Sequence, residues 1–89
     1  MAWKVEVQDN ALGQLSRLST QDTRRILDFL KNRLATYESP RQIGEALKGK
    51  RLGEYWRYRV GDYRLLCEIK DDRLIVLVLE VGNRRDIYR

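Results

Sequence analysis

Residues 55–69 read YWRYRVGDYRLLCEI and begin the stretch 55–88, around which the rest of the chain is organised. Residues 55–60 alternate strictly between two sets of side chains, which is the pattern of a β-strand with one buried face. The turn-prone residues Gly61 and Asp62 separate this segment from a second β-rich segment at residues 63–69. The stretch therefore predicts a β-hairpin with a two-residue loop.

A two-residue loop also predicts which residues lie opposite each other. The opposed pairs are Val60 with Tyr63, Arg59 with Arg64, Tyr58 with Leu65 and Trp56 with Cys67. One face of the hairpin is then apolar, whereas the other carries Arg57, Arg59 and Arg64. Like charges directly opposite each other destabilise a sheet. Either these guanidinium groups are solvated and pair with Glu68 or Glu54, or the face serves an anionic ligand.

A third strand is predicted at residues 74–81, LIVLVLEV, where it pairs with the second strand of the hairpin. This run is apolar on both faces, and one of these faces meets the helices. Few elements remain to cover the other face, so we expect some of Ile75, Leu77 and Leu79 to be open to a partner. Residues 83–85, NRR, follow at once and add guanidinium groups at the end of the strand.

The N-terminal half predicts one strand and two helices. Residues 3–7, WKVEV, have the alternation of a half-buried strand. Asp9 or Asn10 caps a first helix, and a second helix begins at Ser19 and ends at Pro40. The apolar stripes of the two helices are Ala11, Leu12, Leu15 and Leu18, and Ile26, Leu27, Leu30, Leu34 and Tyr37. Such a helical hairpin packs its stripes on the apolar face of the sheet.

The predicted fold class is α+β. An N-terminal strand, a helical hairpin and a three-stranded antiparallel meander form one twisted antiparallel sheet. Residues 41–53 are basic and punctuated by glycine, and we expect there a loop that is either solvated or in contact with phosphate. Residues 1–89 make a single domain, because a chain of this length supports only one modest core.

The composition points to a polyanionic partner or a strongly acidic protein partner. Eighteen Lys and Arg residues against thirteen Asp and Glu residues give a formal net charge of +5. With no histidine and only Cys67, the chain lacks a disulfide framework and the usual zinc and transition-metal ligands, so we expect no metal and no cofactor. We find no signal peptide and no membrane span, and we expect a cytoplasmic protein.

An arginine-rich sheet face is suited to phosphate. These residues assemble no catalytic triad and no phosphate-cradling glycine loop, and Glu54, Glu68 and Glu80 lack the spacing of an acid–base pair. A planar guanidinium group gives phosphate oxygens bidentate hydrogen bonds and stays charged at physiological pH. Three or four such groups could stabilise the extra charge of a phosphorane-like transition state.

Three motifs resemble the RelE/ParE toxin superfamily of bacterial toxin–antitoxin systems, in particular its RelE-like branch. They are LKG at residues 47–49, YRVGDYRL at residues 58–65 and VGNRRDIYR at residues 81–89. The resemblance implies a fold akin to small microbial ribonucleases. It also implies metal-independent cleavage of mRNA in the decoding site of the ribosome, inhibition of translation, and neutralisation by a cognate antitoxin in a heteromeric complex.

The resemblance further implies roles for single residues. Its catalytic set is the basic pair Arg57 and Arg59, the post-turn Arg64, Arg84 after the last strand, and Tyr88, which stacks on a base of the message. Its RNA-binding set is Lys48, Lys50, Arg51 and Arg85. In the family, the position of Arg84 is proposed to hold the general acid.

Two positions depart from the family pattern. Arg59 stands where the family has a lysine that is proposed as general base, and an arginine with a pKa above about 12 is a poor proton acceptor. Asn83 stands where many relatives have histidine, so imidazole catalysis is excluded. The general base is therefore left unassigned, and water or ribosomal RNA could remove the proton.

Three functions remain open at this point. The first is the ribosome-dependent mRNA endoribonuclease, and the second is a ParE-like poison that binds DNA gyrase without catalysis. The third is a non-toxic basic interaction domain, which explains the charge but not the paired arginines. Retention of Arg59, Arg64, Arg84 and Tyr88 favours the ribonuclease.

Overall fold

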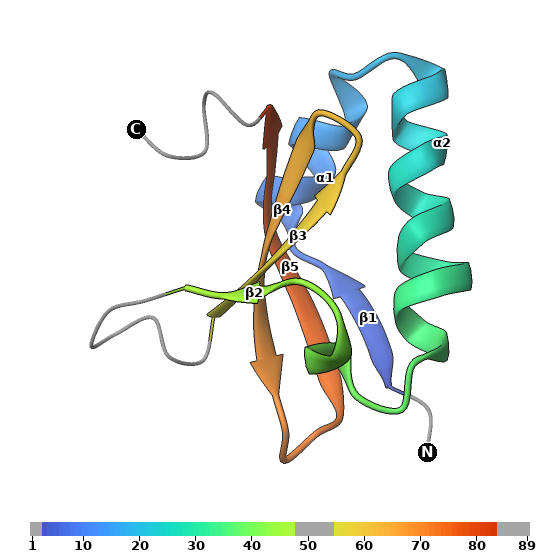
Figure 1. The fold of residues 1–89 in the computed structure, drawn as a ribbon. Coiled ribbons are helices and arrows are strands. Elements are labelled where there is room, and N and C mark those ends of the chain that lie inside the picture. The colour runs from blue at the N-terminus through green and yellow to red at the C-terminus, as the bar shows by residue number, and fades with distance from the viewer. Residues whose placement is uncertain (1–2, 48–54, 84–89) are drawn as a thin grey trace.

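Five strands form one sheet in the computed structural model, which describes residues 3–47 and 55–83 (Figure 1). Their order across the sheet is β1-β5-β4-β3-β2. The single predicted hairpin and meander are therefore present as β3, β4 and β5, flanked by one short strand on each side. The strands are β1 (Lys4–Val7), β2 (Glu45–Ala46), β3 (Tyr55–Val60), β4 (Tyr63–Lys70) and β5 (Ile75–Asn83).

The prediction of a purely antiparallel sheet is wrong. β1 runs parallel to β5, with Lys4 opposite Ile75 and Val7 opposite Val78, so the sheet is mixed. Alternation of side chains shows that β1 has a buried face but carries no information about its direction. The short strand β2 lies within residues 41–53, which were predicted to be a loop. It could not be predicted, because two residues are too few to show any periodicity.

Two short helices cover one face of the sheet (Figure 1). They are α1 (Asp9–Ser16) and α2 (Thr20–Asp28), and α2 continues through a π turn at Phe29–Arg33 and a 3-10 turn at Leu34–Thr36. The Ser19 side chain caps α2 by accepting a hydrogen bond from the backbone N–H of Asp22 at 3.1 Å. Among the described residues, no helix is long and apolar enough to cross a membrane.

Two details of the predicted helices are wrong. Neither Asp9 nor Asn10 caps α1, because the N-cap is Gln8, which makes no side-chain capping bond. Asp9 is the first helical residue, and the Asn10 side chain donates to the backbone oxygen of Leu79 at 3.1 Å. Leu12 is 49% exposed and Leu27 is 36% exposed, although both were assigned to the apolar stripes. Each lies one position beyond a buried residue, so it is rotated to the side of the helix that faces away from the core.

The register of the β3–β4 hairpin is confirmed. All four predicted pairs are present, and Arg59 lies opposite Arg64. Gly61 has φ +59°, a left-handed conformation that glycine adopts without strain. Because the side-chain period of a strand is two, this turn places Tyr58 and Leu65 toward the helices and the arginines on the open face.

A bulge divides β5 into two parts. Leu66 lies opposite Glu80 whereas Cys67 lies opposite Val78, so Leu79 is an extra residue that has no partner on β4. Val76, Val78 and Val81 are all buried. In a strand without a bulge, Val78 and Val81 would face opposite sides of the sheet. Ile75, Leu77 and Leu79 are only half-buried and none is among the strongly exposed apolar side chains of the described residues.

The core lies between the inner face of the sheet and the helices. Cys67 is one of the core residues, and burial raises the pKa of its thiol above the ordinary value. The sheet contributes Tyr58, Leu65, Cys67, Val76, Val78 and Val81, and the helical segment contributes Ala11, Leu15, Ile26, Phe29, Leu30 and Leu34.

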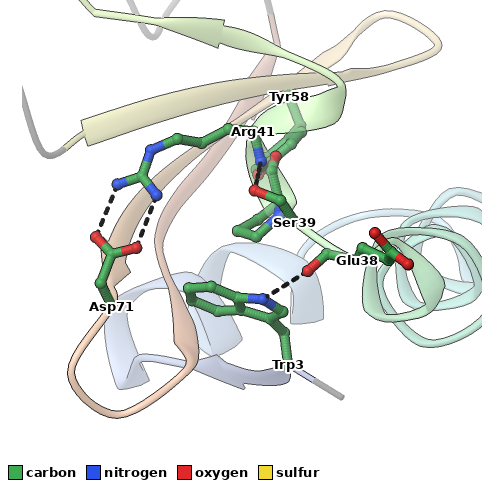
Figure 2. A network of polar contacts seen from close by, with 7 residues as sticks. Trp3, Glu38, Ser39, Arg41, Tyr58 and Asp71 are labelled. Carbon is green, nitrogen blue, oxygen red and sulfur yellow. Dashed lines mark hydrogen bonds and ion pairs between the residues drawn. The ribbon is translucent and has the colours of Figure 1, made fainter. Parts of the chain in front are cut away.

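The segment before β2 is held by polar contacts that Figure 2 shows. Arg41 forms a bidentate ion pair with Asp71 in the β4–β5 turn, at 2.8 and 2.9 Å, and these hydrogen bonds lower the pKa of the Asp71 carboxyl. The buried Tyr58 hydroxyl donates to the Pro40 carbonyl at 2.5 Å, and burial raises the pKa of Tyr58. Trp3 donates to the Glu38 carbonyl at 3.0 Å. These contacts fix the path by which the chain reaches the sheet edge.

Removing the Tyr58 hydroxyl tests the most buried of these contacts. We expect Tyr58→Phe to lower the free energy of unfolding by about 1–3 kcal/mol, because the Pro40 carbonyl loses its donor inside the protein. Tyr37→Phe is the matched control, since the Tyr37 side chain is half-buried and bonds to no other described residue; its effect should stay within about 0.5 kcal/mol. Denaturant unfolding measures both, and equal losses would contradict the role of the hydroxyl.

The opposed arginines give a second prediction about stability. We expect Arg59→Gln to leave the free energy of unfolding unchanged or to raise it by a few tenths of a kcal/mol, because it relieves repulsion across the hairpin. Arg57→Gln is the control on the same strand and should cost up to about 1 kcal/mol, because it breaks an ion pair with Glu45. A larger loss from Arg59→Gln than from Arg57→Gln would show that Arg59 has a structural role.

Candidate functional site

The open face of the sheet brings together three of the arginines predicted from the sequence. Its strands are β3, β4 and β5, on the side away from the helices (Figure 1). Residues that are opposed in register lie on the same face, so side chains form rows across the three strands. One row contains Arg57, Leu66 and Glu80, and the next contains Arg59, Arg64 and Gly82.

The row of Arg59 and Arg64 is the most basic part of this face. Their Cβ atoms are held about 5 Å apart, as for any directly opposed pair in an antiparallel sheet. Arg59 is exposed and Arg64 is half-buried. Gly82 continues the row on β5 and adds no side chain. The row therefore consists of two arginine side chains on β3 and β4 and a bare backbone position on β5.

Arg57 is oriented by β2. Its Nη2 donates to a carboxylate oxygen of Glu45, which lies opposite it in register. The approach of β2 to β3 requires Gly44, which has φ +81°, because an added Cβ would lie 2.6 Å from both the Arg57 carbonyl oxygen and Nε1 of Trp56. Trp56 in turn donates from Nε1 to the Ile43 carbonyl at 2.7 Å. The short edge strand thus fixes one arginine through a carboxylate.

The carboxylates on this face do not neutralise the whole cluster. Glu45 pairs with Arg57, and Glu68 lies 4.0 Å from the ammonium group of Lys70. Arg59 makes no ion pair within the described residues, and Glu54 lies outside them. Simple pairing on a solvated surface therefore accounts for Arg57 but not for Arg59.

Tyr63 anchors the start of β4 to α2. Its hydroxyl donates to Oδ2 of Asp22 at 3.0 Å, and this hydrogen bond raises the pKa of Tyr63. Because Tyr63 directly precedes Arg64, the contact positions the turn end of the hairpin over the helix. The sequence analysis did not identify Asp22 or Glu45, since an acidic residue in the first turn of a helix and one in a basic loop are both ordinary surface residues.

Several predicted site residues lie outside the described residues. These are Lys48, Lys50, Arg51, Arg84, Arg85 and Tyr88. The last described residue, Asn83, lies opposite Tyr63, one position beyond the row of Arg64. Within the described part of the chain, no three His, Cys, Asp or Glu side chains gather closely enough to hold a metal ion.

The arrangement is suited to holding a phosphodiester and not to removing a proton. Guanidinium groups donate up to five hydrogen bonds and accept none, and they remain charged at neutral pH. Arg59 and Arg64 can therefore bind phosphate oxygens and stabilise additional negative charge on them. A reaction at this face needs a proton acceptor from elsewhere.

Comparisons with known proteins identify the family of the chain. The family model of the ParE toxin of the type II toxin–antitoxin system parDE matches residues 5–88. Toxin RelG of Mycobacterium tuberculosis is 30% identical over 89 residues, which cover 100% of this chain and 99% of RelG. A chain in the crystal structure of the M. tuberculosis toxin–antitoxin complex RelBE2 superimposes with a TM-score of 0.83 and 27% identity, over 97% of this chain and 95% of that one.

A more distant structure shares the fold. It is a mutant of the Escherichia coli toxin RelE in the free state, with a TM-score of 0.77 and 22% identity over 98% of this chain and 90% of that one. The family model and RelG each span nearly the whole chain. The chain therefore belongs to the RelE/ParE superfamily and is a toxin of a type II toxin–antitoxin system.

Proposed function

We propose that the chain is an endoribonuclease that cleaves mRNA on the ribosome and thereby inhibits translation. The observation that carries the proposal is the row of Arg59 and Arg64 on the open face of the sheet, where Arg59 has no carboxylate partner among the described residues. Like charges directly opposite each other destabilise a sheet. A bound phosphodiester would offset their repulsion.

The proposed reaction uses the RNA itself as nucleophile. The 2′-hydroxyl oxygen forms a bond to the adjacent phosphorus while the bond from phosphorus to the 5′-oxygen of the next nucleotide breaks. The products are a 2′,3′-cyclic phosphate and a 5′-hydroxyl group. Arg59 and Arg64 stabilise the charge on the phosphorane, and Arg84 is the proposed donor of a proton to the leaving oxygen.

Neither Arg59 nor Arg64 can take the proton from the 2′-hydroxyl. An arginine is protonated throughout the physiological range, and Asn83 offers no imidazole. We assign proton removal to water or to ribosomal RNA. A dependence on the ribosome then follows from an incomplete set of catalytic groups on the toxin.

Poisoning of DNA gyrase is the second candidate function. It is favoured by the match to the ParE family model over residues 5–88. It needs a binding surface but no phosphate chemistry, and the relatives named RelG and RelE argue for the other branch. The two candidates predict different damage in the cell, namely cleaved mRNA or broken DNA.

Cleavage on programmed ribosomes tests the ribonuclease. We expect Arg59→Gln, Arg64→Gln and Arg84→Gln each to lower the single-turnover cleavage rate by about 100-fold or more, a scale typical of removing one transition-state donor. Tyr88→Ala should also slow cleavage through lost base stacking, whereas Tyr88→Phe should retain most of it. Arg73→Gln removes the same charge from the exposed β4–β5 turn and is the control.

Two further results of this experiment decide between the functions. An mRNA with a single 2′-deoxy sugar at the cut site should resist cleavage, because the nucleophile is missing. Arg64→Gln and Arg84→Gln variants that are folded and cut at the parental rate would refute the ribonuclease. DNA breaks in place of cleaved mRNA after induction would then establish the gyrase poison.

We also propose that a cognate antitoxin binds this chain in a tight heteromeric complex. Relatives were crystallised as RelE–RelB complexes, for example from Pyrococcus horikoshii and Methanococcus jannaschii. A net charge of +5 and the half-buried Ile75 and Leu77 suit an acidic, amphipathic segment that folds on binding.

Co-expression with the small protein encoded beside the toxin tests this partner. We expect both proteins to be recovered together and toxicity to be abolished. Leu77→Glu should weaken the complex, because it places a like charge against an acidic segment on the open face. Leu12→Glu on the helical side is the control and should retain the complex. Recovery of the toxin alone would refute the proposed partner.

A further inference from the structure

A pocket of about 270 Å³ lies where the end of β3 meets α2 and the π turn. One member of the row of opposed arginines, Arg59, is among the residues that line this pocket. The other member, Arg64, is not. Its volume is somewhat below the range of about 300–1,000 Å³ that is usual for drug-sized ligands. The residues that line it are Arg25, Asp28, Phe29, Arg33, Arg59, Val60 and Gly61.

The charge of this pocket is strongly positive. Three basic residues, Arg25, Arg33 and Arg59, line it together with a single acidic residue, Asp28. Asp28 accepts a hydrogen bond from Nδ2 of Asn32 at 2.7 Å. Among the described residues, none of the three arginines forms an ion pair. Within the described part of the chain, the pocket thus has one acidic residue for three basic ones.

The arginines are held in place by the fold. The guanidinium carbon of Arg33 lies 5.9 Å from the centroid of the Phe29 ring, within the range of a cation–π contact, and Phe29 is only 8% exposed. The Arg25 guanidinium lies against the β3–β4 turn, where a Cβ added to Gly61 would be 3.3 Å from its Nη1 atom. Arg25 thus lies between α2 and the hairpin turn, whereas Arg33 lies against Phe29 of its own helical segment.

Arg59 connects the pocket with the open face. β2 pairs with β3 only at Trp56 and Arg57, so it does not cover the edge of β3 at Arg59. The basic residues therefore form a track in which Arg64 and Arg59 share a row of the sheet, and Arg59 shares the pocket with Arg25 and Arg33. A polymer with a phosphate at every repeat matches such a track better than a single small anion does.

We propose that this pocket binds a backbone phosphate of the RNA strand whose neighbouring phosphate lies at the row of Arg59 and Arg64. The inference rests on the proposed ribonuclease function and assigns Arg25 and Arg33 to substrate binding outside the reacting centre. An acidic protein segment is also attracted by cations. RNA is favoured because Arg59 belongs both to the pocket and to the row assigned to the scissile phosphate, and because forked guanidinium groups suit phosphate oxygens.

The test measures equilibrium binding of a short fluorescein-labelled single-stranded RNA by anisotropy at several salt concentrations. We compare Arg25→Gln/Arg33→Gln with Arg17→Gln/Arg24→Gln, which removes the same charge from exposed positions, one just after α1 and one in α2, that do not line the pocket. The pocket variant should bind about tenfold more weakly. The plot of log affinity against log salt has a negative slope, and the magnitude of this slope should be smaller by about 0.7 for the pocket variant, the value of one phosphate contact on a single strand. The control slope should equal the parental slope.

Thermal unfolding of both variants and cleavage on programmed ribosomes complete the design. Arg25→Gln alone is included, because Arg33→Gln also removes the contact with Phe29. The inference is overturned if the pocket and control variants have equal slopes, if the parent shows no saturable RNA binding, or if only antitoxin binding is weakened. Failure of the parent to cleave mRNA would instead refute the ribonuclease, and the slopes would still show whether the pocket binds RNA.

Discussion

The repulsion between Arg59 and Arg64 is the interaction around which the functional face is arranged. The two-residue turn with Gly61 in a left-handed conformation holds these side chains directly opposite each other. A slip of one residue would exchange the two faces of the strand and bring the arginines into the core. Burial of Tyr58 and Leu65 on the inner face therefore holds the two cations together on the outer one.

The hairpin could be predicted from the sequence because its information is local. Alternation over residues 55–69 identifies the two faces, and the turn residues determine the register. The parallel pairing of β1 with β5 could not be predicted in this way, since it joins segments that are about seventy residues apart and depends on the path through two helices. Leu12 shows the same limit. The sequence alone does not show whether Leu12 faces the core, and only the position of the helix on the sheet buries Ala11 and Leu15 and leaves Leu12 exposed.

The site was predictable to the same extent as the hairpin. Arg57, Arg59 and Arg64 were placed on one face from alternation alone. Their partners and neighbours, Glu45 and Arg25, come from a two-residue edge strand and from a helix, and no pattern in the sequence joins them to the hairpin. The bulge at Leu79 was also missed, because an extra residue in a continuous apolar run changes the faces of a strand without changing its composition.

That bulge has a consequence for how the chain can tolerate change. Before the bulge, the even-numbered residues Val76 and Val78 are buried. After the bulge, the odd-numbered Val81 is buried, while Glu80 and Gly82 share rows with the arginines. Each part of β5 therefore has core residues on one face and open-face residues on the other: Val76 and Val78 with Leu77 before the bulge, and Val81 with Glu80 and Gly82 after it. A substitution on the open face of either part can alter recognition while the core-facing residues of that part stay unchanged.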